Sequence, residues 1–205
     1  AHLHVAHVST AGAVETIRRA REAGVKVTAE VTPHHLTLTD AATLGFDTST
    51  RVAPPLRSQE HVDALRRGLA EGVIDAIATD HAPHATYEKE VEFTDAPPGM
   101  IGLETALAVS LELVRAGILS PLELVRRLST NPARIFGLEG GSLAVGSPAD
   151  VVLIDPDRGW VYDPGRGHSK SRNSPWADRA MTGRVLATFV DGRLVYNLQR
   201  GSNAE

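Results

Sequence analysis

The chain has 205 residues, of which 42% are hydrophobic and 22% charged, so it is long enough to bury a core. Its net charge of −4, without a basic block, argues against nucleic acid or an anionic membrane as a partner, and no apolar run could span a bilayer. It contains no cysteine, so a bound metal would need nitrogen and oxygen ligands. The cytoplasm is the default location, and a start at Ala1 within an apparent strand indicates a fragment.

Strand and helix signals alternate over residues 1–137, which favours a parallel sheet or barrel. Thr10 or Ser9 can cap the first helix, Gly24 and Gly72 can end the first two helices, and Pro54-Pro55 breaks the loop between them. The expected elements are strands over 3–8, 25–31 and 74–79, and helices over 10–23 and 58–72.

The pattern changes towards the C-terminus. A helical stripe covers 103–114, Ser120 opens a capping box with proline at its first helical position, and a short helix runs from Asn131 to Gly137. Short strands are expected over 142–146, 150–155 and 187–196, with a tight hairpin turn at Asp191-Gly192. We therefore expect an α/β domain over 1–137 and a small β-module over 138–205.

Asp80 directly follows the apolar run 76–79, and His81 and His84 lie beside it. The C-terminal ends of buried strands are where α/β barrels build their active sites. A carboxylate there can bind a metal and take a proton from water whose pKa the metal lowers to about 7. The alternative is a helix cap or an ion-pair partner for Asp80, and a loop-packing role for His81 and His84.

His7 ends the first expected strand, where its imidazole can point over the barrel mouth and suits zinc. The alternative is a histidine held by the helix that follows. His2 and His4 share one face of the strand, but their parity is opposite to that of His7. We therefore expect them to be structural or to support the site.

Two further segments could contribute to a site. His34 and His35 follow the second strand; if they continue it, their side chains point to opposite faces, so at most one reaches the site of His7 and the other packs. Pro98-Gly99 lies in a proline-stiffened loop, and its glycine lets a ligand approach the backbone.

Together these segments resemble the dihydroorotases, a family of the amidohydrolase superfamily. The matching motifs are HVAHVST (4–10), EVTPHHL (30–36), PPLR (54–57), ATDHAPH (78–84), GLET (102–105), NPA (131–133), GSPAD (146–150) and HSKSRNSP (168–175). They run nearly end to end and in order. The resemblance implies the last three strand–helix units of a TIM-type (β/α)8 barrel with a small β-module packed on it.

The resemblance also implies the chemistry. His7 matches a zinc ligand, Asp80 matches the aspartate that contacts zinc and shuttles the proton, His84 matches a substrate-binding histidine, and Pro98-Gly99 matches a loop whose backbone holds the pyrimidine ring. One or two zinc ions would serve the reversible cyclisation of N-carbamoyl-L-aspartate to dihydroorotate in pyrimidine biosynthesis. The family's other metal ligands are not in this chain, so we expect it to be inactive alone and to bind zinc weakly.

Two residues depart from the family pattern: Pro98 replaces the usual phenylalanine, and Ala53 replaces an asparagine that touches substrate. An allantoinase or hydantoinase is one alternative, because these enzymes share the barrel, the His7-type ligand and the Asp80-type base, although His84 and the segment 172–175 favour a dihydroorotase. A non-catalytic scaffold beside aspartate transcarbamoylase is another, which Ala53 supports. The resemblance leaves open a homodimer or association with aspartate transcarbamoylase.

Overall fold

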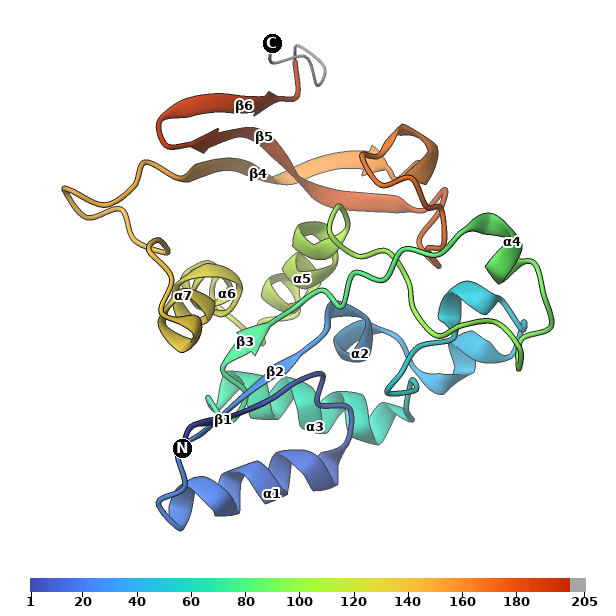
Figure 1. The fold of residues 1–205 in the computed structure, drawn as a ribbon, viewed down its shortest axis with the longest axis horizontal. Coiled ribbons are helices and arrows are strands. Elements are labelled where there is room, and N and C mark those ends of the chain that lie inside the picture. Colours follow the sequence, from blue (N-terminus) through green and yellow to red (C-terminus); the bar gives the residue numbers. More distant parts are fainter. Residues whose placement is uncertain (200–205) are drawn as a thin grey trace.

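A computed structural model describes residues 1–199 and contains two separate three-stranded sheets (Figure 1). The first is parallel, in the order β1-β2-β3, with Leu3 opposite Val27 and Glu30 opposite Ala76. Its strands are β1 Leu3–Val5, β2 Val27–Val31 and β3 Ala76–Ile77. The expected α/β arrangement with a parallel sheet is confirmed, although all three strands are shorter than their apolar runs.

Helices follow each of these strands. They are α1 Ala11–Glu22, α2 Pro33–Thr37, α3 Gln59–Ala70, α4 Thr86–Lys89, α5 Ala106–Arg115, α6 Pro121–Val125 and α7 Asn131–Phe136. The Thr10 hydroxyl caps α1 by accepting from the backbone N–H of Ala13, and Ser120 forms the expected capping box at α6. The π-helical segment Arg126–Thr130 joins α6 to α7, so Asn131 continues a helix rather than starting one.

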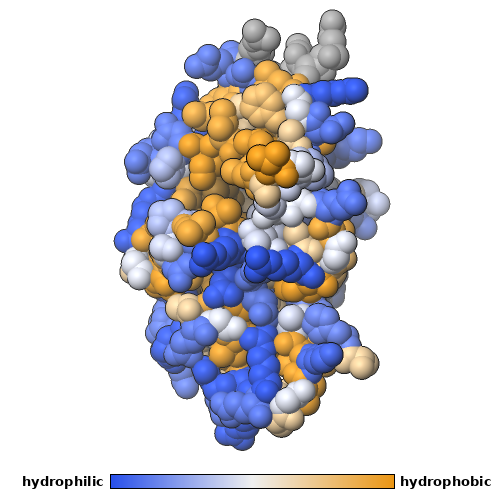
Figure 2. Space-filling view, turned by 90° about the vertical axis from the view of Figure 1, so that its left-hand side faces the viewer, coloured by the Kyte–Doolittle hydropathy of each residue, from blue (hydrophilic) through white to orange (hydrophobic). Residues whose placement is uncertain are grey.

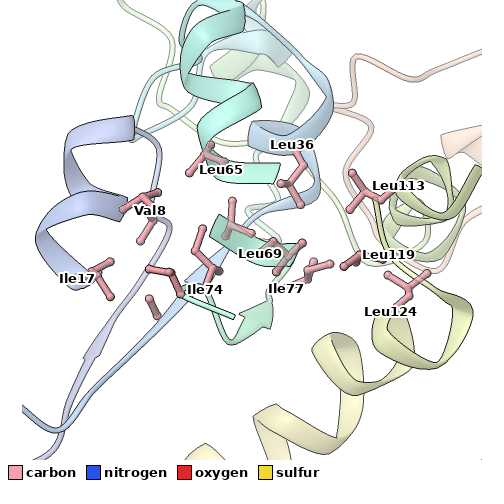
Figure 3. Close-up of a cluster of buried hydrophobic side chains, with 14 of the residues drawn as sticks. Val8, Ile17, Leu36, Leu65, Leu69, Ile74, Ile77, Leu113, Leu119 and Leu124 are labelled. Atoms are coloured by element: carbon pink, nitrogen blue, oxygen red, sulfur yellow. The ribbon is translucent and has the colours of Figure 1, made fainter. Parts of the chain in front are cut away.

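The main core lies between the parallel sheet and the helices α1, α3, α5 and α6 (Figure 3). Leu36, Leu65, Leu69 and Ile74 are all at most 1% exposed. Leu65 and Leu69 are four residues apart on α3, so they share the helix face that packs on the sheet. Burial of this apolar stripe fixes the sheet whose strand ends carry the candidate site.

The second sheet is antiparallel, in the order β4-β5-β6. Its strands are β4 Val151–Val161, β5 Ala180–Val190 and β6 Arg193–Asn197, and the last two meet at the expected turn Asp191-Gly192. The strand expected over 142–146 is wrong: this segment is a loop in which Leu143 is 82% exposed and Val145 fully exposed. Apolar residues alone do not make a strand, because the backbone also needs a pairing partner.

Helix α5 lies between the two sheets (Figure 1). Arg115 at its C-terminal end donates to the carbonyls of Pro156 and Thr182 in the second sheet. A second core, which includes Met100, Val109, Tyr162 and Trp176, continues the contact between α5 and this sheet. The second sheet is therefore attached to the same body as the parallel sheet.

One face of the molecule is rich in exposed apolar side chains, which Figure 2 shows over its upper half. In the second sheet, exposed apolar residues include Val152, Leu153, Val190 and Val195, each 46–52% exposed. Among residues 1–199, β1 pairs only with β2, so its other edge is open. None of the helices in the same residues is long and apolar enough to cross a membrane.

Candidate active site

His7 and Asp80 meet at the carboxyl ends of the parallel strands. Each lies two or three residues beyond its strand, and backbone hydrogen bonds to β2 hold both segments: Val8 donates to the carbonyl of Glu30, and Ala78 to that of Val31. The Nε2 atom of His7 is 3.4 Å from Oδ1 of Asp80. The two side chains, 73 positions apart in the sequence, therefore face the same site.

Both residues have left-handed backbones, with φ of 52° for His7 and 48° for Asp80. Non-glycine residues rarely adopt this region, and the cost is tolerated mostly where function needs a particular side-chain direction. The turn redirects each side chain away from the strand pleat. This explains why β1 ends at Val5 rather than at Val8 as expected.

The spacing of the two side chains fits a shared metal ion. Zinc lies about 2.0–2.2 Å from histidine nitrogen and carboxylate oxygen, so two ligands at a tetrahedral angle are about 3.4 Å apart. His7 Nε2 and Asp80 Oδ1 have this separation. In the part of the chain that the structure describes, however, no group of three or more His, Asp or Glu side chains converges on one point. The described residues therefore bring together two side chains that could hold a metal, His7 and Asp80.

Glu30, which the sequence analysis assigned no role, lies behind His7. Its side chain is 10% exposed; Oε1 is 3.0 Å from His7 Nδ1, and Oε2 is 3.2 Å from His4 Nε2. His4 in turn contacts the Thr28 hydroxyl through Nδ1 at 2.8 Å, and His2 reaches the same hydroxyl at 3.0 Å. The buried carboxylate therefore lies beside Nδ1 of His7, while Nε2 on the other side of the ring faces Asp80.

His34 and His35 do not continue β2, and the expectation that they point to opposite faces of a strand is wrong. Thr32 caps a short helix, α2, with Pro33 at its first position, so both histidines lie on one helical turn. Both are buried, at 1% and 2% exposed. His35 bridges the Thr32 hydroxyl and the carbonyl of Pro54, at 2.7 and 2.9 Å.

Burial sets the protonation of this pair. It lowers the pKa of His34 well below the usual 6.5, and the neighbouring His35 and His7 lower it further. Burial also lowers the pKa of His35, against the opposing effect of its hydrogen bond to Pro54. Both rings are therefore neutral at pH 7 and pack beneath the site as uncharged groups.

The structure brings His84, Pro98 and Gly99 together. His84 Nε2 is 3.1 Å from the carbonyl oxygen of Pro98. Gly99 has φ of +141°, and a Cβ atom placed there would lie 2.6 Å from Ala82 Cβ and 2.9 Å from His84 Nε2. Glycine is thus required by the close approach of the two loops as well as by its backbone angle.

Lys89 also holds the loop that contains Pro98 and Gly99. It is 9% exposed, and its Nζ donates to the carbonyls of Pro97 and Thr48, at 2.7 and 3.0 Å. Burial lowers the pKa of its ammonium group, and nearby Arg51 adds to the effect. The sequence analysis missed Lys89 because a lysine within a charged loop is typical of solvent exposure.

A model of the Amidohydrolase family matches residues 1–195. The chain belongs to the amidohydrolase family. Its resemblance to dihydroorotases is confirmed as well. A dihydroorotase from Pelotomaculum thermopropionicum is 56% identical over 94% of this chain and 45% of its own length. One from Syntrophus aciditrophicus is 53% identical over 96% of this chain and 46% of its own.

Solved structures of amidohydrolases also share the fold. The L-hydantoinase of Arthrobacter aurescens superposes with a TM-score of 0.91 at 33% identity, and covers 100% of this chain and 46% of its own. The dihydropyrimidinase of Brevibacillus agri NCHU1002 gives 0.89 at 31% identity, over 96% and 45%. The chain therefore spans about half the length of the relatives it matches.

Proposed function

We propose that this amidohydrolase chain is the C-terminal half of a zinc-dependent dihydroorotase that interconverts N-carbamoyl-L-aspartate and dihydroorotate. The observation that carries the proposal is the 3.4 Å approach of His7 Nε2 to Asp80 Oδ1 at the carboxyl ends of parallel strands. The identity of 53–56% to proteins named dihydroorotase, against 31–33% to a dihydropyrimidinase and a hydantoinase, favours this substrate.

In this proposal His7 and Asp80 hold the metal together with ligands from the rest of a longer polypeptide. A bound zinc ion supplies Lewis acidity, which activates a water molecule and polarises the amide carbonyl. Asp80 takes the proton of the attacking water and passes it to the ring nitrogen as the amide bond breaks. Cyclisation follows the same proton path in reverse.

His84 and the loop at Pro98-Gly99 have the substrate-binding roles. The ring of His84 lies on the same loop as Asp80, four residues on, and can donate to a substrate oxygen. The open backbone at Gly99 lets a planar ring approach its peptide groups. These two elements orient the cyclic amide while Asp80 handles the proton.

We further propose that residues 1–137 are the last three units of a (β/α)8 barrel and that 138–205 form a small β-module packed on it. The open edge of β1 and the exposed apolar residues of β4–β6 support this assignment. In a longer polypeptide, preceding strands can pair with that edge and other segments can cover those apolar residues. Within this proposal the protein is located in the cytoplasm. It assembles as a homodimer or in a complex with aspartate transcarbamoylase. Sedimentation with and without that enzyme would distinguish the two assemblies.

The test of Asp80 uses this longer polypeptide, with the proposed upstream half joined to the present chain. Asp80→Asn keeps the size of the side chain and tolerates the left-handed backbone but cannot accept the proton. Turnover of dihydroorotate should fall by about 10²- to 10⁴-fold with the fold intact. Asp191→Asn is the matched control, because Asp191 is an exposed aspartate with φ of 50° in a distant hairpin. Near-normal rates for Asp80→Asn would remove Asp80 from the mechanism.

Parallel assays on dihydroorotate, hydantoin and allantoin decide the substrate. The hydantoinase likeness of the fold makes hydantoin the informative competitor. Preference for hydantoin or allantoin would overturn the dihydroorotase assignment. Absence of turnover on all three, with metal bound, would favour a non-catalytic scaffold instead.

The isolated chain provides a separate test of its proposed incompleteness. Catalytic zinc sites usually have three protein ligands, and this chain supplies His7 and Asp80. We expect the 205-residue chain to bind zinc weakly and to show no turnover. Stoichiometric zinc by elemental analysis, together with measurable turnover, would contradict this expectation.

A further inference from the structure

The side chain of Asn173 connects the two loops to which substrate binding is assigned. Its Nδ2 donates to the carbonyls of Ala82 and Gly99, at 2.9 and 3.1 Å. Its Oδ1 accepts from the backbone N–H of His84 at 3.3 Å. Asn173 is 6% exposed, so these bonds form away from water and are costly to lose.

The position of Asn173 in the fold makes this contact more than a local turn. The residue follows the second sheet's β4 and lies 91 and 74 positions from Ala82 and Gly99. Its backbone carbonyl accepts from Ile101 at 3.0 Å, which adds a second tie to the Gly99 loop. The C-terminal segment thus holds both site loops at once.

Asparagine suits this position because its backbone partners need both a hydrogen-bond donor and an acceptor from one side chain. Two carbonyls need donors and one N–H needs an acceptor, and only an amide of this length offers all three at one position. Aspartate has the same shape but no donor, so its oxygens would face the carbonyls of Ala82 and Gly99. That repulsion separates the loops without removing any side-chain volume.

We propose that Asn173 is a positioning residue that sets the distance between His84 and the Gly99 loop, and so governs substrate binding. This inference rests on the proposed dihydroorotase function for its kinetic consequence. Its structural consequence is independent of that function. His84 Nε2 already lies 3.1 Å from Pro98, so small loop displacements change what a substrate meets.

The first measurement is hydrogen exchange on the 205-residue chain, which needs no activity. In Asn173→Asp, exchange should accelerate at the amides of residues 81, 82, 84 and 99–102 and stay unchanged elsewhere. Asn131→Asp is the matched control: Asn131 Nδ2 donates to the Asp75 carbonyl at 2.7 Å, at the opposite end of β3. Unchanged exchange in both loops, or equal acceleration throughout the chain, would overturn the proposal.

The second measurement is the kinetics of the longer polypeptide. Asn173→Asp should raise KM for dihydroorotate ten- to hundredfold, with a smaller fall in kcat, whereas Asn131→Asp should leave KM unchanged. If Asn173→Asp fails to fold, Asn173→Ser, which keeps one donor, should give the same pattern more weakly. A lower Tm with unchanged KM would show a merely structural role. If the parent has no dihydroorotase activity, the proposed function fails and the exchange data alone decide Asn173.

Discussion

Replacement of Glu30 by glutamine tests whether the buried carboxylate behind His7 prepares that histidine for a metal. Glu30 lies between two imidazoles, 3.0 Å from Nδ1 of His7 and 3.2 Å from Nε2 of His4. Glutamine preserves the volume but removes the negative charge. Nδ1 of His7 then loses the negative charge that lies beside it.

The magnitude follows from how such supporting contacts behave. Loss of the partner of a metal-ligating histidine typically costs 10- to 100-fold in metal affinity or activity, which is about 1.4–2.7 kcal/mol. The side chain of Glu30 is only 10% exposed, so solvent does little to screen the interaction. We therefore expect Glu30→Gln to weaken zinc binding by about 10- to 100-fold in the longer polypeptide.

Competition with a chromophoric chelator measures this affinity without reference to turnover. Glu123→Gln is the control, because Glu123 is a glutamate that accepts from the backbone and hydroxyl of Ser120 at the capping box of α6, away from the site. The control should lose some stability and keep its zinc affinity. Zinc affinity of Glu30→Gln within twofold of the parent would refute the reasoning.

Two further predictions concern pH and loop packing. Burial lowers the pKa of His34 and His35 in the folded chain, so the unfolded chain takes up protons at these histidines first as pH falls. The free energy of unfolding should therefore be highest above pH 6.5. Below that pH it should decline by up to about 1.4 kcal/mol per pH unit for each histidine. Urea unfolding at pH 7.5, 6.5 and 5.5 measures this, and a flat profile would contradict it. Gly99→Ala should raise KM and lower Tm, because the new Cβ would lie 2.6 Å from Ala82 Cβ. The control Gly117→Ala should lower Tm alone, because Gly117 has φ of +69° but open space around it. Equal KM values in the two variants would count against the loop contact.

The sequence by itself determined the elements that depend on local signals. Thr10 and Gly24 bracket α1 because capping and left-handed termination need only neighbouring residues. The joint position of His7 and Asp80 was also predictable, since the carboxyl ends of parallel strands meet at one edge. The helical start at Thr32-Pro33 carried a local signal too, a cap followed by proline, which could have corrected the expectation for His34.

Only the tertiary structure decided which polar groups become partners across long stretches of chain. Glu30 contacts His4 and His7 because the pairing of β1 with β2 places these residues side by side. Asn173 contacts the site loops because the segment after β4 packs against them. The strand expected over 142–146 shows the same dependence: among the described residues this segment pairs with no other strand, and Leu143 is exposed. Local propensity depends on neighbouring side chains, whereas strand pairing depends on which distant segment of backbone lies beside the strand in the folded chain.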